Sequence, residues 1–258
     1  MTQDRPHPAR IAFALGLMGL GTLLFVHGDF ALGWPAWVPW RPALVEVAAG
    51  FLSFGGAGLL FARSAPIAAR ILLPFLLLWT ALRVPALFMA PQIEVNWLAV
   101  GEIAVLAAAG WALLAELSPV RDGALVLFVT GPRGRRVVRV LFGASLLAFG
   151  VSHFTYNRET VALVPAWLPL RRTWAYLTGA GHFAAGLGVL LSVYPRLAAA
   201  TEAAMLAIFT VVVWIPAIVS PSATRFAWWE FALSWAIAAG AWVVAGSIPP
   251  ASSMGTRA

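Results

Sequence analysis

A five-residue motif occurs twice in this chain, at positions 130 residues apart. The first copy is Pro35-Ala36-Trp37-Val38-Pro39 and the second is Pro165-Ala166-Trp167-Leu168-Pro169. Four long apolar segments surround each copy in the same order. A repeat of this length predicts that the chain folds as two copies of one structural unit.

The apolar segments predict transmembrane helices. Hydrophobic residues make up 61% of the chain and charged residues 10%, whereas soluble domains carry about a quarter charged residues. Each segment has roughly 20 residues, which is long enough to cross the hydrocarbon core as a helix. Helices are expected because lipid offers backbone amides no other partner. We expect eight spans, at about 10–28, 44–62, 68–90, 96–115, 137–156, 173–194, 200–219 and 226–246.

The repeat and the spans together predict an all-α protein with two repeated four-helix bundles. The first unit covers 1–119, a cytoplasmic linker covers 120–136, and the second unit covers 137–258. An even number of spans gives both units the same orientation in the membrane. Small residues recur at four-residue spacing in the second helix of each unit, which favours close helix packing or a tight lining for a flat ligand. They are Ala49, Ser53 and Ala57 in the first unit, and Ala180, Ala184 and Gly188 in the second.

Arginine placement predicts the topology. All 17 basic residues are Arg, and they lie between the apolar runs, so a membrane is favoured over nucleic acid as the partner. If the N-terminus is inside, eleven Arg residues lie on the inner side and six on the outer side. Both termini are therefore expected in the cytoplasm, with the protein in the plasma (inner) membrane.

Several classes of chemistry are excluded by composition. The chain has neither Lys nor Cys, which excludes lysine Schiff bases, disulfides and thiolate metal sites. It also lacks phosphate-binding, dinucleotide, zinc-protease and serine-hydrolase motifs. We therefore expect no catalytic residues, no metal site and no independent enzyme activity.

Ionisable side chains within the apolar segments are the candidate functional residues, because they are costly in lipid. His27 and His153 end the first helix of each unit, and His182 lies well inside the sixth segment. Rise per residue places His153 roughly 10 Å above His182, which favours hydrogen bonding to a quinone head or to another helix over haem ligation. Arg83 and Glu102 lie at similar depth on adjacent helices, so we expect a buried ion pair with a structural, proton-transfer or substrate role.

Parts of the second unit resemble a known family. Gly150-Val-Ser-His-Phe-Thr-Tyr156, Leu163-Val-Pro-Ala-Trp-Leu-Pro169, Trp174-Ala-Tyr-Leu-Thr-Gly179 and His182-Phe-Ala-Ala-Gly-Leu-Gly188 are similar to the DoxX-like membrane proteins. The first half matches less closely, with Glu46 at the Tyr176 position and Leu52 at the His182 position. The resemblance implies a four-helix membrane unit, usually unfused. It also implies a link to quinone-dependent redox assemblies, since the family includes proteins named for subunits of such oxidases.

The leading hypothesis is an accessory membrane subunit of a quinone-linked redox assembly, embedded in the lipid bilayer beside other subunits. The expected ligand-binding residues are His153, Tyr176, His182, Trp167 at the mouth, and His27. The Trp-Pro loops serve either as interfacial anchors or as caps over a cavity. One alternative is a small-molecule or ion carrier that uses buried Arg, Glu and His. A second alternative is a protein that binds b-type haem.

Overall fold

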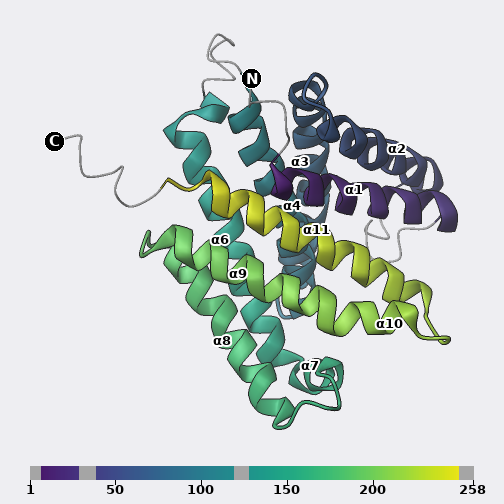
Figure 1. Ribbon diagram of the computed structural model, residues 1–258, viewed down its shortest axis with the longest axis vertical. Coiled ribbons are helices and arrows are strands. Elements are labelled where there is room, and N and C mark those ends of the chain that lie inside the picture. Colours follow the sequence, from purple (N-terminus) through teal and green to yellow (C-terminus); the bar gives the residue numbers. More distant parts are fainter. Residues whose placement is uncertain (1–6, 29–38, 119–127, 250–258) are drawn as a thin grey trace.

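The computed structural model describes residues 7–28, 39–118 and 128–249, and these are almost entirely helical (Figure 1). Most of the first copy of the repeated motif, Asp29, the first half of the predicted linker and the two chain ends lie outside the described residues. The helices are α1 Pro8–His27, α2 Arg41–Leu60, α3 Ala65–Met89, α4 Glu94–Leu117, α6 Pro132–Thr155, α7 Asn157–Leu163, α8 Arg171–Leu190, α9 Pro195–Phe209, the π-helix η1 Thr210–Trp214, α10 Ile215–Val219 and α11 Arg225–Ser247.

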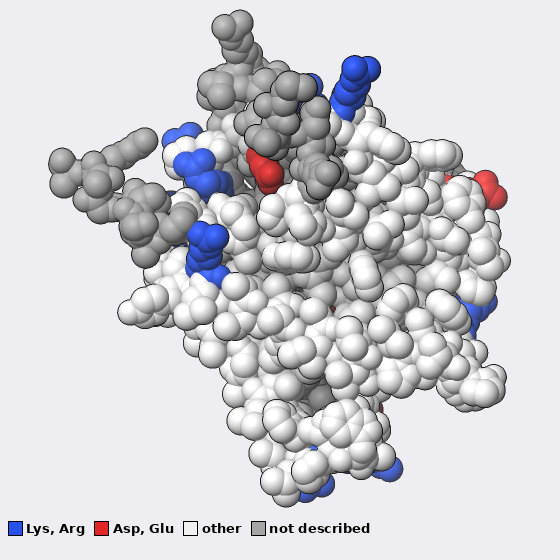
Figure 2. Space-filling view, viewed as in Figure 1, with Lys and Arg blue, Asp and Glu red and all other residues white. Residues whose placement is uncertain are grey.

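Within the described residues, seven helical segments are long and apolar enough to cross a membrane. They are α1, α2, α3, α4, α6, the continuous segment Pro195–Val219, and α11. Helix α8 is not among them, because His182, two threonines and four glycines lower its hydropathy even after the two arginines at its start. Figure 2 shows an uncharged surface between arginines near the edges of the molecule, which is typical of a multi-pass membrane protein.

Helices α4 and α11 lie at the centre of the fold, where they contact each other and both halves of the chain. Their facing surfaces are rich in Ala and Gly, which allows close backbone approach. A Cβ added to Gly240 of α11 would lie 3.2 Å from the Cβ of Ala109 in α4. Helix α1 also crosses α11 closely, and the indole of Trp235 donates a hydrogen bond of 2.8 Å to the carbonyl of Ala12.

The helix contacts fall into two matching sets. In the first half α1 packs on α2, α2 on α3, and α3 on α4. In the second half α6 packs on α8, α8 on α9, and α9 on α11. The halves meet through α4 with α6, α1 with α11, and α4 with α11. The two halves therefore have the same order of helix contacts.

Small residues make the predicted close contact in the first half. A Cβ on Gly21 of α1 would lie 2.9 Å from the carbonyl oxygen of Ala49 and 2.8 Å from the backbone nitrogen of Ser53, both in α2. Ala49 and Ser53 belong to the predicted small-residue face. In the second half the corresponding α6–α8 contact uses glycines instead, as described below, while Ala184 and Gly188 face α9.

Two local features differ from the sequence prediction. The short helix α7 (Asn157–Leu163) follows α6 and precedes the second copy of the motif. The seventh predicted span is continuous, but it contains a π-helical turn that ends at Trp214, two residues before Pro216. Proline has no N–H to donate to the preceding turn, and single π-turns of this kind often lie at functional sites. Both features border the cavity described next.

The surroundings of Gly16 in α1 and Gly50 in α2 predict opposite effects when each is replaced by alanine. A Cβ on Gly16 would lie 2.7 Å from the Cα of Ala236, so Gly16→Ala must separate the helices and should destabilise the protein by about 1–3 kcal/mol. Gly50 has no neighbour within 4 Å of its Cβ position, so Gly50→Ala should stabilise it by about 0.5–1 kcal/mol. Thermal unfolding in detergent measures both. Equal stability of the two variants would contradict the described packing.

Candidate ligand cavity

A cavity of about 700 Å³ lies between α4 of the first half and the helices of the second half. Its walls come from α4, α6, α7, α8, the α9–η1 segment and α11, together with the loop that carries Pro165, Trp167 and Leu168. Ligand sites in helical bundles are typically apolar hollows with a few polar groups. The polar or ionisable lining residues are Glu102, Ser152, His153, Tyr156, Glu159, Thr160, Thr178, His182, Glu230 and Ser234.

Close packing of α6 against α8 places the two histidines. A Cβ on Gly143 would lie 3.1 Å from the carbonyl oxygen of Gly186, and one on Gly150 would lie 3.1 Å from that of Gly179. These pairs fix the antiparallel register of the two helices. A Cβ on Gly179 would lie 2.8 Å from the Cβ of His153, so only glycine leaves room for this imidazole beside α8.

The rings of His153 and His182 are in edge contact, with centroids 4.8 Å apart and planes at 64°. The two rings meet although the sequence places His153 roughly 10 Å above His182 by rise per residue. In the observed register the two Cα positions differ by about six residues, roughly 9 Å along the axis. However, Cβ atoms tilt toward the N-terminus of their own helix. Because α6 and α8 are antiparallel, the two side chains lean toward each other and the rings meet.

His182 forms a buried pair with Glu202 of α9. Its Nδ1 lies 2.7 Å from Oε1 of Glu202, and the two side chains are 2% and 0% exposed. The other carboxyl oxygen, Oε2, has no hydrogen-bond partner in the described residues. Burying these groups is costly unless they pair, so His182 and Glu202 act as a unit, with the imidazole at the cavity wall and the carboxyl group behind it.

Aromatic and hydroxyl groups hold the two imidazoles in position. Phe149 contacts the His182 ring edge-on at a centroid distance of 5.7 Å, and Phe209 stacks on His153 at 6.1 Å. Nδ1 of His153 lies 3.0 Å from Oγ1 of Thr178 and 3.3 Å from the carbonyl oxygen of Ala175. The Nδ1 atoms of both rings thus have protein partners.

Acidic side chains approach the cavity from the central helices. Glu102 of α4 and Glu230 of α11 line it and interact electrostatically, and Arg83 of α3 attracts Glu102. Glu94, at the start of α4, is buried and accepts a hydrogen bond from Ser152 of α6. The electrostatic attraction between Arg83 and Glu102 is consistent with the predicted ion pair. A direct contact between their side chains stays a prediction.

The structure brings together only part of the predicted ligand-binding set. His153, His182 and Trp167 line the cavity. Tyr176 does not, because it lies on the outer face of α8, 45% exposed and stacked on Phe154 at 5.8 Å. His27 ends α1 in the other half of the chain and is not a lining residue.

Glu202 and Glu230 are not among the predicted site residues, because the spans predicted from the sequence begin at 200 and 226 and so place both residues near a helix start. The sequence did contain a signal, namely acidic residues inside apolar segments. Glu202 is the eighth residue of α9, just over two turns from its start, and an acidic residue at that depth needs a buried partner. Each of the two residues lies on a helix that packs against the cavity.

The histidine pair does not fit a bis-imidazole haem. Metal–nitrogen bonds of about 2 Å would hold two axial imidazole centres roughly 6 Å apart on opposite sides of the iron. Here the rings touch edge-on at 4.8 Å, and Nδ1 of His182 is bound to Glu202. The described residues also contain no group of three His, Asp or Glu arranged for a metal ion.

Comparison with known proteins adds one similarity. A family described as a domain of unknown function (DUF8561) matches residues 142–245, which extend from α6 into α11. The matched part therefore contains the histidine pair, Glu202 and most of the cavity wall. No curated protein and no solved structure matches the chain.

The attraction between Arg83 and Glu102 predicts a non-additive pair of substitutions. Arg83→Leu leaves an acidic group without its compensating charge, which typically costs about 3–5 kcal/mol at a buried site. The double variant Arg83→Leu, Glu102→Leu removes both charges and should be closer to the wild-type stability. A double-mutant cycle in thermal unfolding measures the coupling. Additive losses would contradict a direct pair.

Proposed function

We propose that the protein is a DoxX-like, multi-pass membrane protein whose cavity binds the head group of a quinone, and that it serves as an accessory subunit of a quinone-linked redox assembly. The observation that carries this proposal is the contact of His153 with His182, backed by the buried carboxyl group of Glu202, at the wall of an apolar cavity. Imidazoles can donate to or accept from a ring oxygen, and the surrounding aromatic side chains offer surfaces for a flat ring.

The proposed function includes a proposed arrangement of the helices in the membrane. Two four-helix units, α1 to α4 and α6 to α11, cross the membrane eight times in all, with α8 as the eighth span. The matching helix contacts in the two halves support the duplication. The polar residues of α8 do not oppose a membrane position, because His182 and Thr178 face the cavity, and Arg171 and Arg172 lie at the helix end, where arginine can reach the interface.

The chemistry that these residues provide is hydrogen bonding and proton exchange. A bound quinone would supply the electron-accepting ring. The chain contributes the His182 imidazole, whose Nδ1 position is fixed by Glu202, and carboxyl groups at Glu102 and Glu230. Electron transfer would require a redox partner in the same assembly, which agrees with an accessory role.

A second candidate function is a carrier that exchanges protons for an organic cation. One observation favours it: the charged residues among the cavity lining are all Glu, namely Glu102, Glu159 and Glu230. Carboxyl groups in an apolar cavity are costly to ionise, and a cation that enters beside aromatic rings would offset this cost while protons leave. The π-turn η1 and Pro216, in or next to the wall, would then form the hinge.

The proposed orientation can be tested with reporter fusions. We expect a periplasmic reporter to be active when fused after Pro35 and inactive when fused after Arg133. One predicted span separates Pro35 from the cytoplasmic N-terminus, and four separate Arg133 from it. Activity at both sites, or at neither, would contradict the eight-span arrangement with both termini in the cytoplasm.

Quinone binding can be measured by quenching of tryptophan fluorescence, because Trp167, Trp174 and Trp214 line the cavity. We expect decylubiquinone to quench the purified protein. The variant His182→Leu alone leaves Glu202 buried without its partner, so the double variant His182→Leu, Glu202→Leu is used to preserve the fold. It should bind roughly tenfold to a hundredfold more weakly, the effect of one lost hydrogen bond.

Two variants serve as matched controls for this experiment. His27→Leu removes the histidine that ends the matching helix of the first half, and Tyr176→Phe changes a residue on the outer face of α8. Both should bind like the wild type. Unchanged binding by the double variant would overturn the assignment of the site. Absence of quinone binding, with proton release when tetraphenylphosphonium is added, would favour the carrier.

A further inference from the structure

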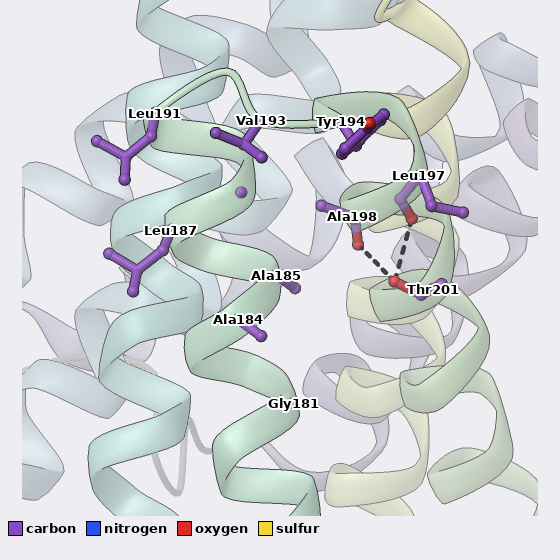
Figure 3. Close-up of a pocket in the computed structure, with 11 residues that line it drawn as sticks. Gly181, Ala184, Ala185, Leu187, Leu191, Val193, Tyr194, Leu197, Ala198 and Thr201 are labelled. Carbon is purple, nitrogen blue, oxygen red and sulfur yellow. Dashed lines mark hydrogen bonds between the residues drawn. The ribbon is translucent and has the colours of Figure 1, made fainter.

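A second hollow lies between α8 and α9, at the end of the molecule opposite α7. It has a volume of about 540 Å³ and is closed at one end by the loop between the two helices (Figure 3). The small side chains of Ala184 and Ala198 form its floor, and Leu187, Leu191 and Leu197 flank it. We call this hollow the α8–α9 groove.

The lining of the α8–α9 groove suits a hydrocarbon chain. Leu191 and Leu197 are 68% and 62% exposed, so large apolar surfaces flank the groove without protein cover. The hydroxyl group of Thr201 is directed to its own helix, where it donates to the carbonyl oxygens of Leu197 and Ala198 at 3.0 Å each (Figure 3). No charged side chain lines the groove.

Positive charge lies at the closed end of the groove. Ser192, between the lining residues Leu191 and Val193, accepts a hydrogen bond of 2.7 Å from Arg139 of α6. That bond uses one of the five N–H donors of the guanidinium group. Arg196, between the lining residues Tyr194 and Leu197, is exposed. Two guanidinium groups therefore lie beside the residues that close an apolar groove.

We propose that the α8–α9 groove binds an anionic phospholipid, with an acyl chain along the apolar lining and the phosphate group at Arg139 and Arg196. Basic groups next to apolar crevices between membrane helices recognise anionic lipid head groups in this way. The end concerned is the one that the arginine distribution predicts to be cytoplasmic, where anionic lipid attracts basic segments. The proposal rests on α8 lying in the membrane, as proposed above.

Lipid binding can be measured by native mass spectrometry of the delipidated full-length protein in neutral detergent. Palmitoyl-oleoyl phosphatidylglycerol is titrated against palmitoyl-oleoyl phosphatidylcholine. We expect a stoichiometric adduct with the anionic lipid only. Arg139→Gln, Arg196→Gln should weaken it roughly thirtyfold, given the usual contribution of each arginine near an anionic head group. Ala184→Phe should remove the adduct, because its ring occupies the exposed floor of the groove.

Matched control variants distinguish lipid binding at the α8–α9 groove from nonspecific attraction of anionic lipid to arginine. Arg63→Gln, Arg133→Gln removes the same charge from exposed positions predicted to lie at the same end and should bind like the wild type. Arg196→Gln alone keeps the Arg139–Ser192 bond, so it still reports on binding if the double variant does not fold. Equal binding of the two lipids, an equal loss in the control, or full binding by Ala184→Phe would each overturn the proposal.

Quenching of tryptophan fluorescence by quinone is measured in the same variants and should not change. Failure of the lipid site can therefore be distinguished from failure of the cavity.

Discussion

The approach of α6 to α8 is the contact on which the cavity depends. Two glycines on each helix, seven residues apart, meet in an antiparallel register. In lipid, apolar side chains gain little by leaving their surroundings, so close backbone packing must supply much of the association energy. The same glycines decide where the larger side chains go. They leave space beside Gly179 for the imidazole of His153, and they set the register that brings it to His182.

The buried pair of His182 and Glu202 extends this arrangement to α9. A carboxyl group that is fully enclosed and has one oxygen without a partner is expensive. The first half of the chain has Leu52 and Leu72 at the corresponding positions, and both are buried. An apolar pair therefore satisfies packing in one half, while the other half keeps the polar pair. The difference points to a role for the polar pair beyond holding the helices together.

Much of the architecture could be predicted from the sequence, because the length and continuity of apolar segments follow directly from the properties of the bilayer. The small residues Ala49 and Ser53 also make the close helix contact that was predicted for them. The site was less predictable. The contact of His153 with His182 depends on the tilt of side chains in a particular register, which rise per residue does not include. Tyr176 was wrongly expected in the lining, because its position six residues from His182 puts it on a different face of α8.

One wall of the cavity comes from the other half of the chain, through Leu98 and Glu102 of α4. The part of the sequence that matches a known family begins at residue 142 and therefore lacks that wall. A chain with only one such unit would have to borrow the wall from a second copy, and a symmetric dimer would then hold two identical chambers. In the proposed duplication, joining the two units in a single chain removes that symmetry. One unit can then keep the buried pair of His182 and Glu202, while the other has the buried Leu52 at the position that corresponds to His182. Covalent linkage, rather than assembly of separate chains, then sets the ratio of the two units and allows them to differ.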